Sequence, residues 1–170
     1  MACSVPLNLT PSLWTGTPAS LDVPERLTPS QWAEKYRTLT RRQSSRPGRW
    51  DNRNSPALVG LMDIAWKQRQ IRKLHIRKAA QVGVSEAMRN VMGFMGHLEP
   101  DPILLVLPDE KTGKRIMSKR ILPLFEDTPS LRELKTDASR DQGLTQVLLA
   151  NGFQLSLAWS GSAATMAAAT

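Results

Sequence analysis

Cysteine is scarce in this 170-residue chain, which holds a single thiol, Cys3. One cysteine excludes an intramolecular disulfide, and neither His75 nor His97 has a Cys or acidic residue at metal-ligand spacing, so we expect both histidines to be structural. The chain also lacks an apolar stretch of the ~20 residues that cross a bilayer, and it lacks a secretory signal. These absences predict a soluble protein of a reducing, cytoplasmic compartment with no membrane partner.

Acidic residues are the second shortage, with 15 Asp and Glu against 23 Lys and Arg, for a net charge of +8. Residues 35–78 contain 13 basic residues and only Asp51 and Asp63, a local charge of +11, so the remainder carries −3. Such a segment attracts polyanions, whether a nucleotide triphosphate or a DNA backbone. Composition alone leaves three readings open: nucleotide binding, DNA binding and an ordinary solvated basic face.

One octapeptide resembles a phosphate-binding loop with its lysine displaced. It consists of Lys78, Ala79, Ala80, Gln81, Val82, Gly83, Val84 and Ser85. In G-x-x-x-x-G-K-[ST] the lysine follows the second glycine, where this chain has Val84, whereas Lys78 stands at the place of the first glycine. The pattern predicts that Lys78 contacts phosphate, that backbone N–H groups near Gly83 cradle it, and that the Ser85 hydroxyl contacts Mg²⁺.

The surroundings of this loop favour the same interpretation. Alternating apolar residues predict a half-buried strand over 73–77, and helical spacing from Val84 to Leu98 predicts the helix after the loop. The continuous apolar run 103–107 is typical of a parallel strand covered on both faces. The expected fold is therefore α/β, with an incomplete parallel β-sheet of P-loop NTPase type flanked by helices.

The remaining elements follow from local signals. The composition of residues 1–27 predicts a flexible leader. A capping box predicts a helix that begins at Thr28 and ends near Thr40, so we expect the segment before the loop to be mostly helical. Further expected elements are a loop over 41–54, helices over 55–66 and 109–122, a helical turn over 127–134, a polar loop to 143, and a two-residue hairpin turn at Asn151-Gly152. The helix 109–122 presents Lys111, Arg115 and Lys119 on one face and Gly113, Met117 and Ile121 on the other.

From about residue 27 onward, the chain resembles the ATPase domain of the large terminase subunit of tailed phages, of the lambda-type GpA group. The motifs that carry the resemblance are Pro47-Gly48-Arg49-Trp50, Pro56, Lys78 to Gly83, Leu107-Pro108, Asp127 to Leu131 and Ser160-Gly161-Ser162. A lysine at the front of the loop is this family's deviant Walker A arrangement. Many members have an arginine inside the loop where this chain has Gln81, which implies that a charge-stabilising arginine comes from elsewhere.

The resemblance implies ATP and Mg²⁺ as cofactors, residues 78–85 as the Walker A region, and Arg49 and Trp50 near the adenine. It implies an ATP hydrolase that packages double-stranded DNA, with the small terminase subunit, the portal and procapsid, and further copies of itself as partners in the host cytoplasm. Residues 28–170 would be the N-terminal part of the ATPase domain. The Walker B carboxylate and the family's endonuclease domain are absent from the sequence, so we expect no catalytic residue here and no hydrolysis by this chain alone.

Two other interpretations remain open. A non-catalytic, basic nucleic-acid-binding protein would use its charge electrostatically. The candidate DNA-binding residues are Arg41, Arg42, Arg46, Lys111, Arg115 and Lys119. A truncated, inactive prophage gene product would need neither ligand.

Overall fold

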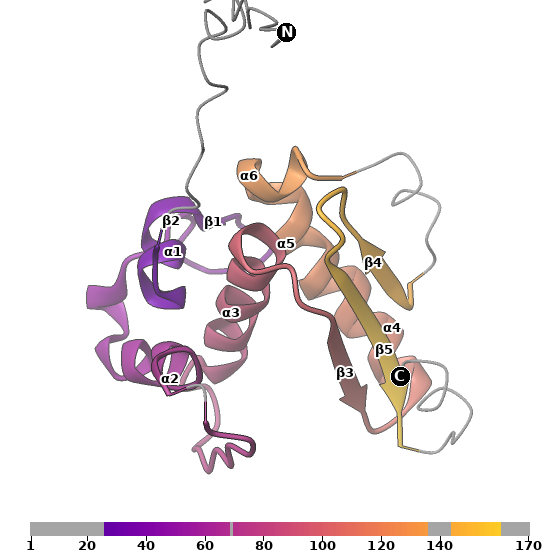
Figure 1. Cartoon of the computed structure of the whole chain (residues 1–170), viewed down its shortest axis with the longest axis horizontal. Coiled ribbons are helices and arrows are strands. Elements are labelled where there is room, and N and C mark those ends of the chain that lie inside the picture. The colour runs from indigo at the N-terminus through magenta and orange to yellow at the C-terminus, as the bar shows by residue number, and fades with distance from the viewer. Residues whose placement is uncertain (1–25, 69, 136–143, 161–170) are drawn as a thin grey trace, which may run out of the picture.

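The computed structural model describes residues 26–68, 70–135 and 144–160 (Figure 1). Almost all of the predicted leader 1–27, the polar loop up to 143 and the serine-containing segment after Ser160 lie outside these described residues. In the described part of the chain, no helix is long and apolar enough to cross a membrane.

The first helix, α1, spans Pro29–Tyr36, and its predicted capping box is confirmed. Thr28 Oγ1 accepts a hydrogen bond from the Gln31 N–H, and the Thr28 N–H donates to Gln31 Oε1 at 2.9 Å. The predicted end near Thr40 is wrong, because the backbone is already extended at Arg37 and strand β1, Thr38–Leu39, pairs antiparallel with β2, Gly48–Arg49. The predicted loop 41–54 therefore contains β2 and a 3-10 turn, Asn52–Asn54.

Helices α2, Pro56–Lys67, and α3, Val84–Leu98, confirm the helices predicted on either side of the loop. Figure 1 shows α3 between the N-terminal helices and the sheet, and both α1 and α2 pack against it. Among its most buried side chains are Phe94 and Asn90, at 1% and 0% exposure. The loop thus runs directly into the helix on which the N-terminal half of the domain is assembled.

The strand predicted over 73–77 is not formed, which corrects the sequence interpretation. These residues have no regular secondary structure, and Leu74 and Ile76 are 40% and 38% exposed. Alternation makes a segment suited to a half-buried sheet face, but a strand also needs a neighbouring strand to pair with and an apolar layer to cover it. Neither is provided to residues 73–77 by the described part of the chain.

A three-stranded sheet in the order β3-β5-β4 forms the other side of the domain. Strand β3, Ile103–Leu107, pairs parallel with β5, Gln154–Trp159, and β4, Gln146–Leu148, pairs antiparallel with β5. The predicted strand 103–107 is confirmed, but covering on both faces is wrong, since Leu104 and Val106 are 40% and 47% exposed. The mixed α/β class is confirmed, and the parallel sheet starting at 73–77 is not formed.

The hairpin around Asn151-Gly152 is confirmed with a longer turn than predicted. The Leu149 N–H donates to the Phe153 carbonyl at 3.0 Å, which leaves three residues in the turn. Gly152 alone among them has a positive φ, +87°. A turn of this length ending in a left-handed glycine is the next commonest hairpin connection after the two-residue type.

The predicted helix 109–122 is a continuous helical run in three parts. Helix α4 spans Glu110–Ile116, a π-helical segment follows at Met117–Ile121, and α5 spans Leu122–Asp127. The wider π turn ends two residues before Pro123, whose ring would crowd the carbonyl four residues earlier in a regular helix. The two predicted faces are confirmed: Gly113, Met117 and Ile121 are buried, whereas Lys111, Arg115 and Lys119 are exposed. Helix α6, Pro129–Arg132, occupies the predicted turn.

Candidate phosphate-binding site

The loop before α3 turns into the helix through two left-handed residues, Gln81 with φ 58° and Gly83 with φ 82°. Gly83 is the N-cap of α3, and its carbonyl accepts the N–H groups of Glu86 at 2.9 Å and Ala87 at 3.1 Å. A Cβ at this position would lie 3.0 Å from Leu58 Cδ1 of α2. Glycine is therefore required for the backbone conformation and for the close approach to α2.

A pocket of about 850 Å³ opens beside this junction. Its walls come from the loop and the first turns of α3, from β3, from the region around the π-helical segment, and from residues 43–45. Of the eight predicted loop residues, Lys78, Gln81, Gly83, Val84 and Ser85 line it, whereas Ala79, Ala80 and Val82 are exposed parts of the loop that do not. The pocket is large enough for a nucleotide-sized ligand.

Lys78 and Ser85 bring the predicted ligand groups to this pocket. Both side chains are exposed, and Lys78 Nζ donates to the Ala79 carbonyl, a neutral acceptor, at 3.4 Å. In the first turn of a helix the N–H groups have no intrahelical acceptor, and the positive end of the helix dipole lies there. The Ser85 hydroxyl fits one Mg²⁺ ligand position, since Mg²⁺ in phosphate sites takes few protein ligands and shares phosphate oxygens. The described residues contain no cluster of three or more Asp, Glu, His or Cys that would hold a metal ion alone.

Glu86 is the acidic side chain of the pocket, and it is paired. Arg89 Nε donates to Glu86 Oε2 at 3.0 Å and a second Arg89 nitrogen contacts Oε1. Arg37 Nη2 lies 3.8 Å from the same carboxylate. Because two arginines face this one carboxylate, its repulsion of an incoming phosphate is reduced.

Arg37 lies beneath this wall with its side chain fully buried. It donates to the Thr38 carbonyl at 3.0 Å and to Gln43 Oε1 at 2.8 Å, and Gln43 in turn donates to Asp127 Oδ2 at 2.8 Å. Burial lowers the pKa of Arg37 to about 10, which still leaves it charged at neutral pH. The network ties the chain around Gln43 to both α3 and α5, and so holds one wall of the pocket.

Among the pocket residues that sequence reasoning missed are Gln43, Arg89 and Arg120. Arg120 Nη1 donates to the Gln43 carbonyl at 3.2 Å, which joins the π-helical segment to the chain of residues 43–45. The excess of arginine before the loop was visible in the sequence, and Pro123 was a local signal for a disturbed helix near Arg120. The fold of residues 40–46 onto α5 has no local sequence signal.

Arg49 and Trp50, predicted to lie near the adenine, do not line the pocket. Arg49 Nη2 donates to the carbonyls of Glu34 and Lys35 at the end of α1, at 3.3 and 2.8 Å. Trp50 is buried, and its Nε1 donates to Asn52 Oδ1 at 2.8 Å. Both residues thus have structural contacts in the described part of the chain, and a role toward adenine stays a prediction.

The candidate DNA-binding residues form two exposed sets. Arg41, Arg42 and Arg46 lie between β1 and β2, and Lys111, Arg115 and Lys119 lie along α4 and the π-helical segment. The hydrogen bond between Arg120 and Gln43 brings the two segments into contact. A basic surface beside the pocket is consistent with a polyanionic partner.

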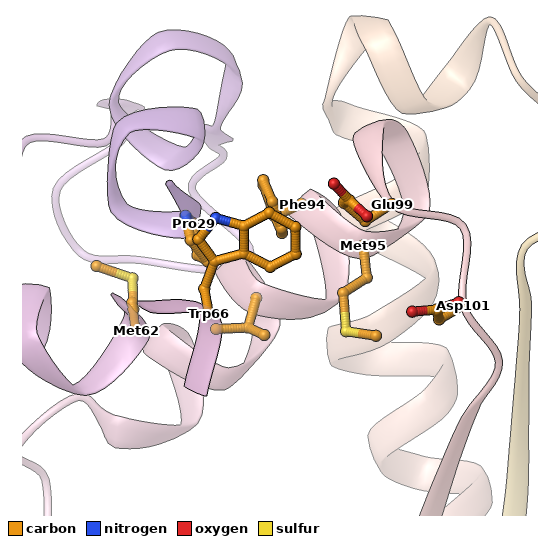
Figure 2. Close-up of a pocket in the computed structure, with 8 residues that line it drawn as sticks. Pro29, Met62, Trp66, Phe94, Met95, Glu99 and Asp101 are labelled. Atoms are coloured by element: carbon orange, nitrogen blue, oxygen red, sulfur yellow. The ribbon is translucent and has the colours of Figure 1, made fainter. Parts of the chain in front are cut away.

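A second pocket, of about 320 Å³, lies between α2, α3 and the start of α1. Figure 2 shows the Trp66 ring on one side and Met95, Glu99 and Asp101 on the other. Among the described residues that line it, none is Lys or Arg. An apolar pocket with two carboxylates disfavours an anion, whereas the larger pocket is lined by Lys78, Arg89 and Arg120.

Gly83 joins the loop to α3, and the Lys78 ammonium and the Ser85 hydroxyl line one pocket beside this junction. These groups define a candidate anion-binding site in a mixed α/β fold. The family model of the ATPase domain of the phage terminase large subunit gpA matches residues 44–170. The chain therefore belongs to this family of ATPase domains. Comparison with curated proteins and with solved structures finds no match.

Proposed function

We propose that this chain is the N-terminal part of a DNA-packaging ATPase and binds ATP with Mg²⁺ through residues 78–85. The observation that carries the proposal is the position of Lys78, Gly83 and Ser85 on one pocket at the start of α3, in a chain of the terminase ATPase family. Lys78 neutralises charge on the β- and γ-phosphates, as a lysine does in other phosphate loops. The N–H groups from Gly83 to Ser85 bind phosphate oxygens.

A magnesium ion would supply neutralisation of charge on the phosphates of a bound nucleotide. Ser85 would hold it through the hydroxyl. Residues 37 to 45 contribute by holding one wall of the pocket, through the buried Arg37 and Gln43 contacts. In this scheme nucleotide binding and hydrolysis are separable, because a catalytic carboxylate is a different part of the site from the phosphate cradle.

In the packaging motor, double-stranded DNA, the small terminase subunit, the portal and procapsid and further copies of the chain would be the partners. The family places the domain in DNA packaging, and the local charge of +11 over residues 35–78 supports contact with DNA. We expect the exposed arginines of residues 41–46 to contribute through phosphate contacts rather than base readout.

Titration of the full chain with a fluorescent ATP analogue, with and without Mg²⁺, tests nucleotide binding. Lys78→Ala should weaken binding on the order of tenfold or more, because a charge-assisted contact to phosphate is lost. Lys73→Ala is the matched control, since Lys73 is an exposed lysine of the same segment that does not line the pocket. If Lys78→Ala binds as tightly as the parent, the role of Lys78 is wrong.

A second candidate function is nucleic-acid binding without nucleotide, which the exposed Arg41, Arg42 and Arg46 favour. It predicts DNA binding that falls with salt, is indifferent to ATP and Mg²⁺, and loses part of its salt slope when these arginines are neutralised. A parent chain that binds neither ligand would instead fit an inactive gene product.

A further inference from the structure

The pocket beside the loop contains two arginines whose partners differ. Arg89 forms a two-point contact with the Glu86 carboxylate, so its charge is balanced. Arg120 donates through Nη1 to the neutral Gln43 carbonyl at 3.2 Å, and none of the ion pairs between described residues includes it. Arg120 is therefore a cation of this pocket with its charge uncompensated by the described residues.

The charge of the proposed ligand requires such a cation. A triphosphate with one Mg²⁺ keeps a net negative charge, and charge develops further on the terminal phosphate when it is transferred. Lys78 supplies one positive charge, and the left-handed loop residue Gln81 is neutral. Glu86 faces Arg89 and the buried Arg37, and Arg37 does not line the pocket. Arg120 is the remaining arginine among the described residues that line the pocket.

The placement of Arg120 is structurally fixed although its side chain is exposed. It lies in the π-helical segment between Met117 and Ile121, whose side chains are 0% and 1% exposed and anchor the segment in the core. Single π turns inside longer helices occur frequently at functional sites, because the added residue redirects neighbouring side chains. The backbone position is thus held, while the side chain has only a neutral hydrogen bond to give up.

Resting on the proposed function of this pocket, we infer that Arg120 binds the terminal phosphate of a magnesium nucleoside triphosphate. It exchanges its bond to the Gln43 carbonyl for charge-assisted bonds to phosphate oxygens, and the guanidinium can make two of these in parallel. The pocket then recognises triphosphate over diphosphate through a side chain outside the loop.

Titrations of the full chain with fluorescent analogues of ATP and ADP, both with Mg²⁺, test this inference. Arg120→Gln keeps an amide donor for the Gln43 carbonyl but removes the charge, and Arg120→Lys keeps the charge but loses the planar fork. We expect Arg120→Gln to raise the dissociation constant for the ATP analogue on the order of tenfold and to leave that for the ADP analogue nearly unchanged. Arg120→Lys should lie between Arg120→Gln and the parent.

Arg115→Ala is the matched control, because Arg115 is exposed on α4 and does not line the pocket; it should bind both analogues like the parent. Equal losses for ATP and ADP in Arg120→Gln would mean a structural effect and overturn the inference, as would no loss for either. If Lys78→Ala weakens both nucleotides while the Arg120 variants weaken neither, the proposed function stands and only this inference falls. If the parent binds no nucleotide, both fall.

Discussion

Arg37 is the residue on which the wall of the pocket depends. Its guanidinium is fully buried, donates to a backbone carbonyl and to Gln43, and lies 3.8 Å from Glu86. Its Nε has no hydrogen-bond partner among the described residues. A buried charge with one unmet donor is costly to keep, so the local structure is sensitive to any loss of its partners.

We predict that Arg37→Ala lowers the free energy of unfolding by about 3–5 kcal/mol, the usual effect of breaking a buried, hydrogen-bonded charge pair. The variant also leaves Gln43 Oε1 without its donor and opens a cavity beside Thr128. Urea denaturation followed by circular dichroism measures the change. Arg41→Ala is the control, since Arg41 is exposed and should change stability by no more than about 0.5 kcal/mol. Equal stability of the two variants would contradict the importance of the buried network.

At the scale of elements, the contact of α1 with α3 passes through a glycine. The side chain of Trp32, 0% exposed, lies against Gly93, where an added Cβ would be 2.7 Å from Trp32 Cζ3. Trp32 also donates from Nε1 to His97 Nδ1 at 3.0 Å, one turn further along α3. The indole is thus held at the edge of its six-membered ring and at its polar end, and it has little freedom to move aside.

Gly93→Ala should therefore destabilise the chain by about 1–3 kcal/mol, the range for overpacking a tight core. Helix propensity alone would favour alanine by nearly 1 kcal/mol, so the sign of the change decides between the two effects. Gly60→Ala in α2 is the matched control, because no atom lies within 4 Å of its added Cβ. Thermal unfolding of both variants should show Gly93→Ala below the parent and Gly60→Ala at or above it; a stabilised Gly93→Ala would show that Trp32 can shift.

Helices were predictable from sequence where periodicity and caps agreed, and strands were predictable only in part. The bounds of α3 follow from the glycine before it and the apolar spacing within it, and the α1 capping box fixes where that helix starts. Residues 73–77 show the limit. Their alternation is genuine, but a strand is a property of a pair, and the described residues place no partner beside them. The continuous apolar run of β3 correctly predicted a strand, but the predicted cover on both of its faces was wrong. Cover, like pairing, depends on neighbouring elements and not on the run itself.

The candidate site was predictable as a segment but not as a pocket. Local pattern located Lys78, Gly83 and Ser85, since glycine, hydroxyl and lysine lie within eight residues. Gln43 and Arg120 lie far from the loop in sequence and join it only through the packing of residues 40–46 against the run from α4 to α5. Side chains that tertiary packing brings together carry no local signal.

At the scale of the whole molecule, the three-stranded sheet has an open side at β3 among the described residues. Strand β3 is at the edge of the three-stranded sheet, so along its outer side the described residues provide no pairing strand. Two of its side chains, Leu104 and Val106, are 40% and 47% exposed on one face. An aliphatic edge strand without a charged or proline residue is a template for pairing with another chain.

We predict that the chain self-associates through β3 at rising concentration and that charge on this strand reduces the association. Sedimentation velocity over a concentration series should show larger species for the parent than for Leu104→Lys or Val106→Lys. Because both positions are already exposed, the substitutions should change the free energy of unfolding by no more than about 0.5 kcal/mol. Leu144→Lys is the control, a 41% exposed leucine outside the sheet that should associate like the parent. If all three variants associate equally, another surface drives assembly, and the open side of the sheet is not the contact.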